Sequence, residues 1–453
     1  MDYLIPSAVF LLAVTLAVSV YYRQAWSNNI TNLLFANRSL SMISSGLAIN
    51  SHWFWAIAIF VSPAVAYNWG MIGLLWFVIP NAFSLIIVAW LTRRIRNEYP
   101  DGFSLTEYIK IKAGVGLGSF YYVMFVLIAL AGMLLGFTAL FKYFSFVSIT
   151  LLVEPIYIAL LFGTITLLFT VTGGIRSSIL SGSIQTVAWL SFLSVVMFYI
   201  WPGSPISMFD IAGKNQLTTV FDYTFLTTFA VAWLFTITVG ATSHGMMWQK
   251  SFSMPKENIM PSYTIAAVLF AAMVFMVGSL GLYAQGAELA IGSADTAQMT
   301  TIANVVGPLG LLIFGILIIG QTSTVMDSCM NYISSVVSLE WFKSDNLWLA
   351  RSAMAIFFFA AWLLTWLKLE VWTIFMFMGV LRLSMFLPLV AIVNQYQFNH
   401  RVILTASSAA VIGSILLAYV AKMHKLPIYD MYSVLFAVVM SAAALCYSAR
   451  KTI

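Results

Sequence analysis

A polar stripe interrupts one of the most apolar parts of the chain, between Ile319 and Glu340. Hydroxyl and amide side chains recur there at steps of three and four residues, which places them on one face of a helix. They are Gln321, Thr324, Ser328, Asn331, Ser335 and Ser338. Asp327 lies one position away from the stripe. Because a carboxyl group inside a membrane is costly, such a residue is expected to be functional and to face protein or water. The stripe therefore predicts the wall of a pathway for a polar species.

Two charged residues inside apolar segments each allow more than one interpretation. Asp327 is either a structural acid that caps or joins helices, or a carboxyl that couples transport to an ion or proton, and its depth favours coupling. Arg382 can snorkel to the inner face, form a structural ion pair, or bind the carboxylate of a substrate. A guanidinium matches a carboxylate in bidentate geometry, so substrate binding and structure are kept as equal alternatives.

Two histidines lie in segments where polar residues and glycine or proline interrupt the apolar sequence. His52 follows Asn50 and Ser51, and His244 lies in the run Gly240–Gly245. Buried histidines are usually hydrogen-bonded members of a core, but two at similar positions make a polar solute site an equal interpretation. Trp53 and Trp248 are the tryptophans expected beside that site. The four histidines of the chain do not have the spacing of a metal site.

The composition defines the class of protein in which these residues must act. Of 453 residues, 62% are hydrophobic and only 8% are charged, whereas about 25% are charged in soluble domains. Apolar runs of about 20 residues recur along the chain, which predicts an all-α polytopic membrane protein surrounded by lipid. The net charge of +6 is attributed to loops that orient the protein, so no nucleic-acid partner is expected. The two cysteines are expected to be free thiols.

About thirteen spanning segments are predicted from the apolar runs. They lie near residues 4–22, 43–66, 71–93, 117–141, 152–172, 177–201, 225–249, 259–284, 305–339, 348–367, 370–395, 402–421 and 428–448. With the N-terminus outside and the C-terminus inside, the basic residues gather in the inner loops, and Lys250 is counted among them. The N-terminal segment is expected to be a retained helix rather than a signal peptide.

The two interrupted segments, 43–66 and 225–249, lie five helices apart. Interrupted helices that line a cavity, at corresponding positions of two halves, are typical of transporters with inverted repeats. We therefore expect one transporter domain over 1–453 with four parts. These are a first helix and inner loop (1–42), a first five-helix repeat (43–201), a second five-helix repeat (225–395) and two C-terminal helices (402–453).

Four motifs resemble the sodium:solute symporter family, over roughly residues 36–345. They are FANRSL at Phe35–Leu40, EYPDGFSLTEYIKIKAG at Glu98–Gly114, TVTGGIRSSILSGSIQ at Thr170–Gln185 and STVMDSCMNYISSVVSLE at Ser323–Glu340. They occur in the family's order and on the corresponding helices. The resemblance implies a LeuT-type fold of five plus five helices with flanking helices, and it implies alternating access around a site at the middle of the membrane.

The resemblance also implies a sodium site between the broken helix 43–66 and the helix of the stripe. Its candidate ligands are the backbone carbonyls of Ser51, Phe54 and Gln321 and the hydroxyl of Thr324. Two positions depart from the family. Val325 stands where a second hydroxyl is expected, and Ser181-Gly182 stands where the family has a Thr-Asp pair. The departures leave Na⁺ and H⁺ as alternative coupling ions, and Na⁺ is the one candidate cofactor.

The resulting expectation is a symporter, not an enzyme, for a small polar organic solute. Arg382 and the histidines favour an amino acid or a carboxylate. The candidate solute-binding residues are His52, Trp53, His244, Trp248, Gln321 and Arg382, and Asp327 is the candidate for ion coupling. The alternative is a solute sensor that keeps this fold and site but has lost ion coupling. The compact loops favour a prokaryotic plasma membrane.

Overall fold

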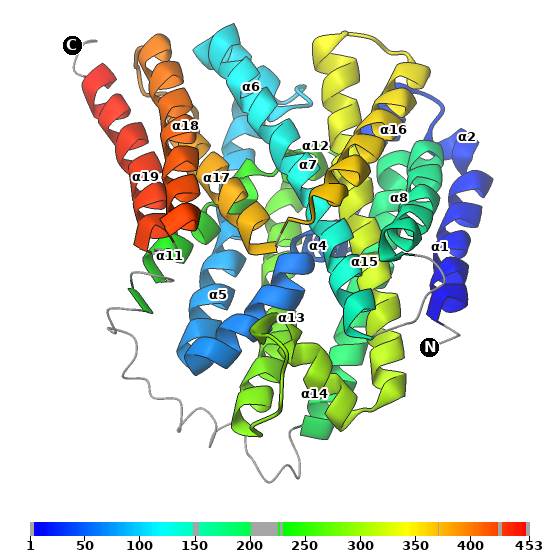
Figure 1. Cartoon of the computed structure of the whole chain (residues 1–453). Coiled ribbons are helices and arrows are strands. Elements are labelled where there is room, and N and C mark those ends of the chain that lie inside the picture. The colour runs from blue at the N-terminus through cyan, green and yellow to red at the C-terminus, as the bar shows by residue number, and fades with distance from the viewer. Residues whose placement is uncertain are drawn as a thin grey trace.

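The computed structural model describes residues 4–147, 154–200, 225–226, 230–369, 371–424 and 428–449. Within these ranges the chain is a bundle of helices without strands (Figure 1). The described part holds ten helices that are long and apolar enough to cross a membrane. Helices satisfy their own backbone hydrogen bonds, which is why they can span a lipid bilayer. The predicted all-α polytopic fold class is confirmed.

The structure describes the following helices, in chain order. In the first half they are α1 (Leu4–Tyr21), α2 (Arg23–Trp26), α3 (Ile30–Phe35), η1 (Ala36–Arg38), α4 (Met42–Trp53), α5 (Ala56–Glu98), α6 (Leu105–Ala113), α7 (Val115–Phe146) and α8 (Pro155–Ile200). In the second half they are α11 (Val231–Thr238), η4 (Gly240–Ser243), α12 (Gly245–Phe252), α13 (Lys256–Gly286), η5 (Ala294–Thr296), α14 (Ala297–Val305), α15 (Pro308–Ser335), η6 (Val336–Trp341), α16 (Leu347–Leu364), η7 (Thr365–Leu367), α17 (Val371–Val393), α18 (His400–His424) and α19 (Ile428–Ala449).

The longest helical runs turn back on themselves at glycines with positive φ. Gly70 has φ 64° within α5, and Gly174 has φ 58° within α8. Glycine adopts this conformation without a Cβ penalty. Both glycines lie between predicted spanning segments: Gly70 between 43–66 and 71–93, and Gly174 between 152–172 and 177–201. The count of about thirteen spans, the orientation and the division into two repeats stay predictions. The predicted loop 202–224 lies outside the described residues.

The short helices α4 and α12, each next to a helix break, are packed among long helices. α4 packs against α8, α13 and α15, while α12 lies against α5, α7 and α15. α18 and α19 pair with each other and flank α17. The short helix α6 and the C-terminal end of α19 lie at one end of the bundle, and α14 lies at the opposite end (Figure 1). This arrangement brings the candidate site residues into the middle of the bundle.

Both interrupted segments are broken helices, as the sequence predicts. α4 ends at Trp53, after which Phe54 (φ −80°, ψ 64°) and Trp55 (φ −102°, ψ −169°) leave the helical conformation before α5 begins. α11 ends at Thr238, and the extended residue His244 (φ −93°, ψ 104°) separates η4 from α12. Each break exposes backbone polar groups that need partners inside the bundle.

One sequence interpretation is wrong. Lys250 was assigned to an inner loop, but α12 continues to Phe252 and only 2% of Lys250 is exposed. The break at His244 starts a new helix late in the segment, so Lys250 falls in its middle and its side chain turns into the bundle. The ammonium is held there by a backbone carbonyl rather than by water.

The turn at Gly174 provides a test of the fold. An added Cβ would lie 2.1 Å from the carbonyl oxygen of Leu33, and φ is in the range that only glycine adopts readily. Gly174→Ala should lower the free energy of unfolding by about 1–3 kcal/mol from backbone strain alone. The melting temperature of the purified protein in detergent measures this loss. Gly292→Ala, whose Cβ meets no atom within 4 Å, should leave it unchanged; equal shifts would contradict the turn.

Candidate functional site

The two broken helices meet through aromatic rings at the centre of the bundle. The rings of His52 and His244 lie 6.1 Å apart between centroids. Trp53 and Trp55 contact His244 edge-on at 5.1 and 5.2 Å. At most 5% of any of these four side chains is exposed. Trp55 is a contact that the sequence analysis did not single out; its place directly after the break is the signal that could have identified it.

Arg382 joins this cluster from α17. Its Nη2 atom lies 3.0 Å from Nε2 of His244, and 2% of the residue is exposed. Arg382 therefore does not snorkel to the inner face. A guanidinium only donates hydrogen bonds, so Nε2 of His244 accepts and the imidazole proton is on Nδ1. Among the described residues, no carboxylate forms an ion pair with Arg382.

Several polar atoms of the cluster are buried without a hydrogen-bond partner in the described structure. They are both ring nitrogens of His52, Nε1 of Trp53, Nδ1 of His244 and Nε of Arg382. A buried polar group without a partner costs about 1–3 kcal/mol. Most of these atoms are donors beside a guanidinium charge, and such a set suits an acceptor with negative charge, such as a carboxylate. Of the six predicted solute-binding residues, the structure brings these four together.

Gln321 has a different role from the four clustered residues. Its amide nitrogen donates to the backbone carbonyl of Ser51, and its Oε1 lies 3.4 Å from the Ser51 hydroxyl. The side chain thus ties the middle of α15 to the last turn of α4. Gln321 is committed to the backbone at the break rather than free to bind a solute.

The other candidate sodium ligands are only partly assembled. The Thr324 hydroxyl donates to the carbonyl of Gly320 and lies 3.2 Å from the Ser181 hydroxyl. The ring of Phe54 packs edge-on against Trp189, with centroids 5.3 Å apart. The carbonyl of Ser51 already accepts from Gln321. The candidate ligands thus include a hydroxyl and carbonyls, and Ser51 and Thr324 both form hydrogen bonds with other residues of the protein.

Lys250 is the functional candidate that the sequence analysis missed. Its ammonium donates to the carbonyl of Ala48, 3.0 Å away, in the last turns of α4. The sequence offers a signal that a helix after the break includes Lys250. Lys250 follows Met246 by four residues, so both lie on one helix face, and no proline ends the helix before Pro255.

Asp327 lies buried next to α8. Oδ1 accepts from the hydroxyl of Ser178 at 2.6 Å and from that of Ser328 at 3.1 Å, whereas Oδ2 has no partner within the described residues. The charge of Asp327 interacts with that of Lys250 across the bundle, although the two are not in direct contact. Asp327 therefore faces protein and an opposite charge, as expected for a functional acid inside a membrane.

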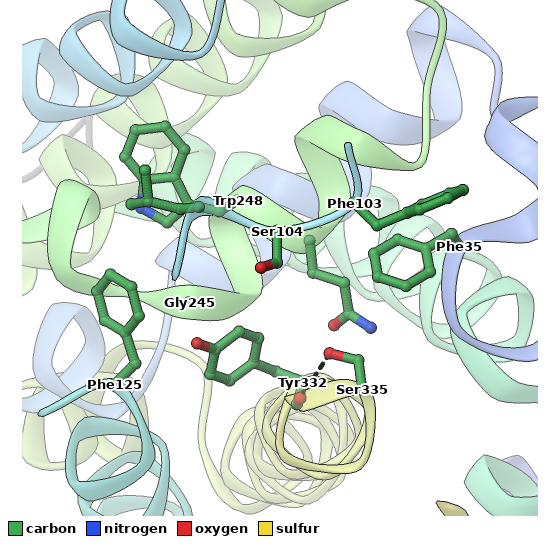
Figure 2. A pocket seen from close by; sticks show the side chains of 10 residues that line it. Phe35, Phe103, Ser104, Phe125, Gly245, Trp248, Tyr332 and Ser335 are labelled. Atoms are coloured by element: carbon green, nitrogen blue, oxygen red, sulfur yellow. Dashed lines mark hydrogen bonds between the residues drawn. The ribbon is translucent and has the colours of Figure 1, made fainter. Parts of the chain in front are cut away.

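A small pocket continues from the second break toward α3 and α6. Figure 2 shows Gly245 and Trp248 on one side and Tyr332 and Ser335 of α15 on another. The indole of Trp248 donates to the carbonyl of Thr242 at 2.7 Å and so bridges the two sides of the break at His244. The stripe thus runs from the break in α4, at Gln321, into this pocket, at Ser335. The whole stripe is buried, which agrees with a pathway wall inside the protein.

Charged and polar contacts join the loops at this end of the pocket. Arg38 donates to the backbone carbonyls of Pro100 and Gly102. Glu340 accepts from Thr106 and pairs with Lys110 at 3.3 Å. These contacts connect η1 to the segment before α6, and α6 to η6.

Two comparisons agree with this architecture. A Na⁺-coupled sialic acid symporter, solved in a substrate-bound outward-open state, is similar with a TM-score of 0.73 and 16% identity, covering 98% of each chain. A probable urea active transporter of Schizosaccharomyces pombe is 21% identical over 279 residues, which is 56% of this chain and 40% of that protein. The chain thus spans less than half the length of that relative. No family model matches the chain.

Both similar proteins are solute transporters, and the structural match covers nearly the whole chain. The resemblance to sodium:solute symporters, and the symporter fold that it implies, are confirmed. The roles of the individual site residues stay predictions.

The hydrogen bond that closes the second break gives a test of this geometry. Trp248→Phe keeps the aromatic ring but removes the donor to Thr242, which should cost about 1–3 kcal/mol of stability if the carbonyl is left without a partner. Thermal unfolding in detergent measures the loss. Trp348→Phe, at a position that is 76% exposed, is the matched control and should have no effect. An unchanged melting temperature for Trp248→Phe would contradict the contact.

Proposed function

We propose that the chain is a secondary active transporter for a small polar organic solute that carries a carboxylate. The solute binds between the broken helices, against Arg382, His244, Trp53 and His52. The proposal includes solutes that carry an amino group as well, because His52 and the tryptophan faces can accept a donor or a cation. The cell membrane, of prokaryotic type, is the proposed location.

One observation carries the proposal. The guanidinium of Arg382 is buried beside His244, and no carboxylate of the described residues pairs with it. A buried charge without a counter-charge is expensive. A solute carboxylate supplies that counter-charge and also accepts hydrogen bonds from the partnerless donors around it. Neutral solutes such as sugars or urea leave the charge uncompensated.

The mechanism follows from the position of the site on discontinuous helices. Rocking of the bundle around a fixed midplane site opens the site alternately to the two sides of the membrane. The contacts of Arg38 and Glu340 and the pocket beside Trp248 form the inner gate of this cycle. The coupling ion is Na⁺ or H⁺, and coupling requires that ion and solute each bind better when the other is present. Asp327 is the residue proposed for ion coupling.

The role of Arg382 can be tested by binding and uptake together. Small monocarboxylates and amino acids should raise the melting temperature of the purified protein, whereas glucose and urea should not. Arg382→Gln should abolish this shift and lower uptake into proteoliposomes by about tenfold or more, because a hydrogen bond to a charged group contributes about 1.5–3 kcal/mol. Arg401→Gln, on the exposed start of α18, is the control. An Arg382→Gln variant that keeps both the shift in melting temperature and the uptake would refute the binding of a solute carboxylate by Arg382.

The proposed coupling by Asp327 is tested with Asp327→Asn. The amide keeps the shape of the side chain and can still accept from Ser178, but it cannot exchange a proton or carry charge. Concentrative uptake should be lost while exchange of solute between the two sides persists. Full concentrative uptake with unchanged dependence on pH would contradict the role.

The same measurements separate a transporter from the alternative, a solute sensor. Val325 and Ser181-Gly182 favour the sensor because they depart from the family's ion-binding residues. A carboxylate that stabilises the protein but is not taken up under any imposed Na⁺ or H⁺ gradient would identify a sensor.

A further inference from the structure

The residues at the expected sodium site do not fit a sodium ion. Na⁺ prefers several free oxygen ligands in an open cage. Here the Ser51 carbonyl accepts from Gln321. The position of the second hydroxyl is held by Val325, whose side chain cannot bind a cation. One candidate carbonyl is thus already engaged by a protein donor, and one of the two expected hydroxyl ligands is missing.

A positive charge built into the protein lies beside this place. The carbonyls of Ala48 and Ser51 are three residues apart, so they lie on one face of the last turns of α4. The Ser51 carbonyl binds the Gln321 amide, and the Ala48 carbonyl binds the ammonium of Lys250 at 3.0 Å. The C-terminal end of a helix attracts cations. Ala48 and the candidate ligand Thr324 both border Gly182, one of the two positions that depart from the family.

The charges around Lys250 are balanced without an added ion. Only 2% of Lys250 is exposed, and the carboxyl of Asp327 on α15 is the acidic group that acts on it. His52 of α4 also lies within electrostatic range. One ammonium offsets one carboxylate. A sodium ion at the Ala48 and Ser51 carbonyls would add a second positive charge next to the ammonium, which is strongly unfavourable in a medium of low dielectric constant.

We infer that the ammonium of Lys250 is a tethered cation beside the expected sodium site and replaces a sodium ion as the positive charge there. The ammonium joins α12 to α4, whereas the expected sodium site lies between α4 and α15. The chain accordingly binds no Na⁺ at this position. This inference rests on the proposed transport function for its significance, but it concerns ion binding and can be tested without a solute.

Equilibrium binding of radioactive ²²Na⁺ to the purified full-length protein tests the inference. The wild-type protein should show no saturable ²²Na⁺ binding. Lys250→Ala removes the charge and leaves space beside the Ala48 carbonyl, so it should gain saturable binding. That gain should fall by about tenfold or more in affinity in the double variant Lys250→Ala, Thr324→Val, since a hydroxyl ligand is lost. Lys256→Ala, at the exposed start of α13, is the control and should behave like the wild type.

Each outcome decides the question. Saturable ²²Na⁺ binding to the wild type that is lost with Thr324→Val would overturn the inference, and so would a folded Lys250→Ala variant that gains no binding. If Lys250→Ala does not fold, wild-type binding alone decides, since saturable binding refutes a tethered cation and its absence supports one. Failure of carboxylate uptake would refute the transport proposal and leave this result standing.

Discussion

The structure depends on one constraint: backbone groups released by the two helix breaks need partners inside the bundle. In a membrane no water is available to supply them. Side chains from neighbouring helices do so instead. Gln321 binds the carbonyl of Ser51, and Trp248 binds that of Thr242. Lys250 adds a contact to the carbonyl of Ala48, within α4. These three contacts stabilise the irregular backbone of both breaks and fix α4, α12 and α15 relative to one another.

The proposed solute site consists of buried polar side chains that do not serve as partners for the backbone at the breaks. His52, Trp53, His244 and Arg382 are buried at the crossing of the breaks, yet each retains a polar atom without a partner in the described structure. Such a set is costly in an empty protein and useful when a complementary ligand fills it. Gln321 and Lys250 bind backbone carbonyls, whereas the guanidinium of Arg382 is left to bind a ligand.

Much of the fold follows from local features of the sequence, as particular residues show. Apolar runs predict the helices, Gly174 predicts a turn, and the polar residues around His52 and His244 predict the breaks, because each signal acts within a few residues. The contact of Arg382 with His244 joins residues 138 positions apart, and no local pattern predicts it. The prediction that Lys250 lies in a loop is wrong for a related reason. It treats 225–249 as one helix, whereas a new helix begins after His244 and continues past Lys250 to Phe252.

The likeness to a sodium-coupled symporter therefore extends to the architecture more clearly than to the ion site. Gly182, one of the departures from the family, borders Ala48, whose carbonyl binds the ammonium of Lys250. A departure at this place is expected if, as we infer, a charge of the protein replaces a bound ion. The proposed solute site keeps its polar atoms without partners in the described structure.

An experimental structure of the protein with a stabilising carboxylate, determined in sodium-containing buffer, tests the central claim most directly. The expected result is solute density between Arg382, His244 and Trp53, with the Lys250 ammonium on the Ala48 carbonyl. Solute density elsewhere, with Arg382 turned to a protein carboxylate, would contradict the proposed site.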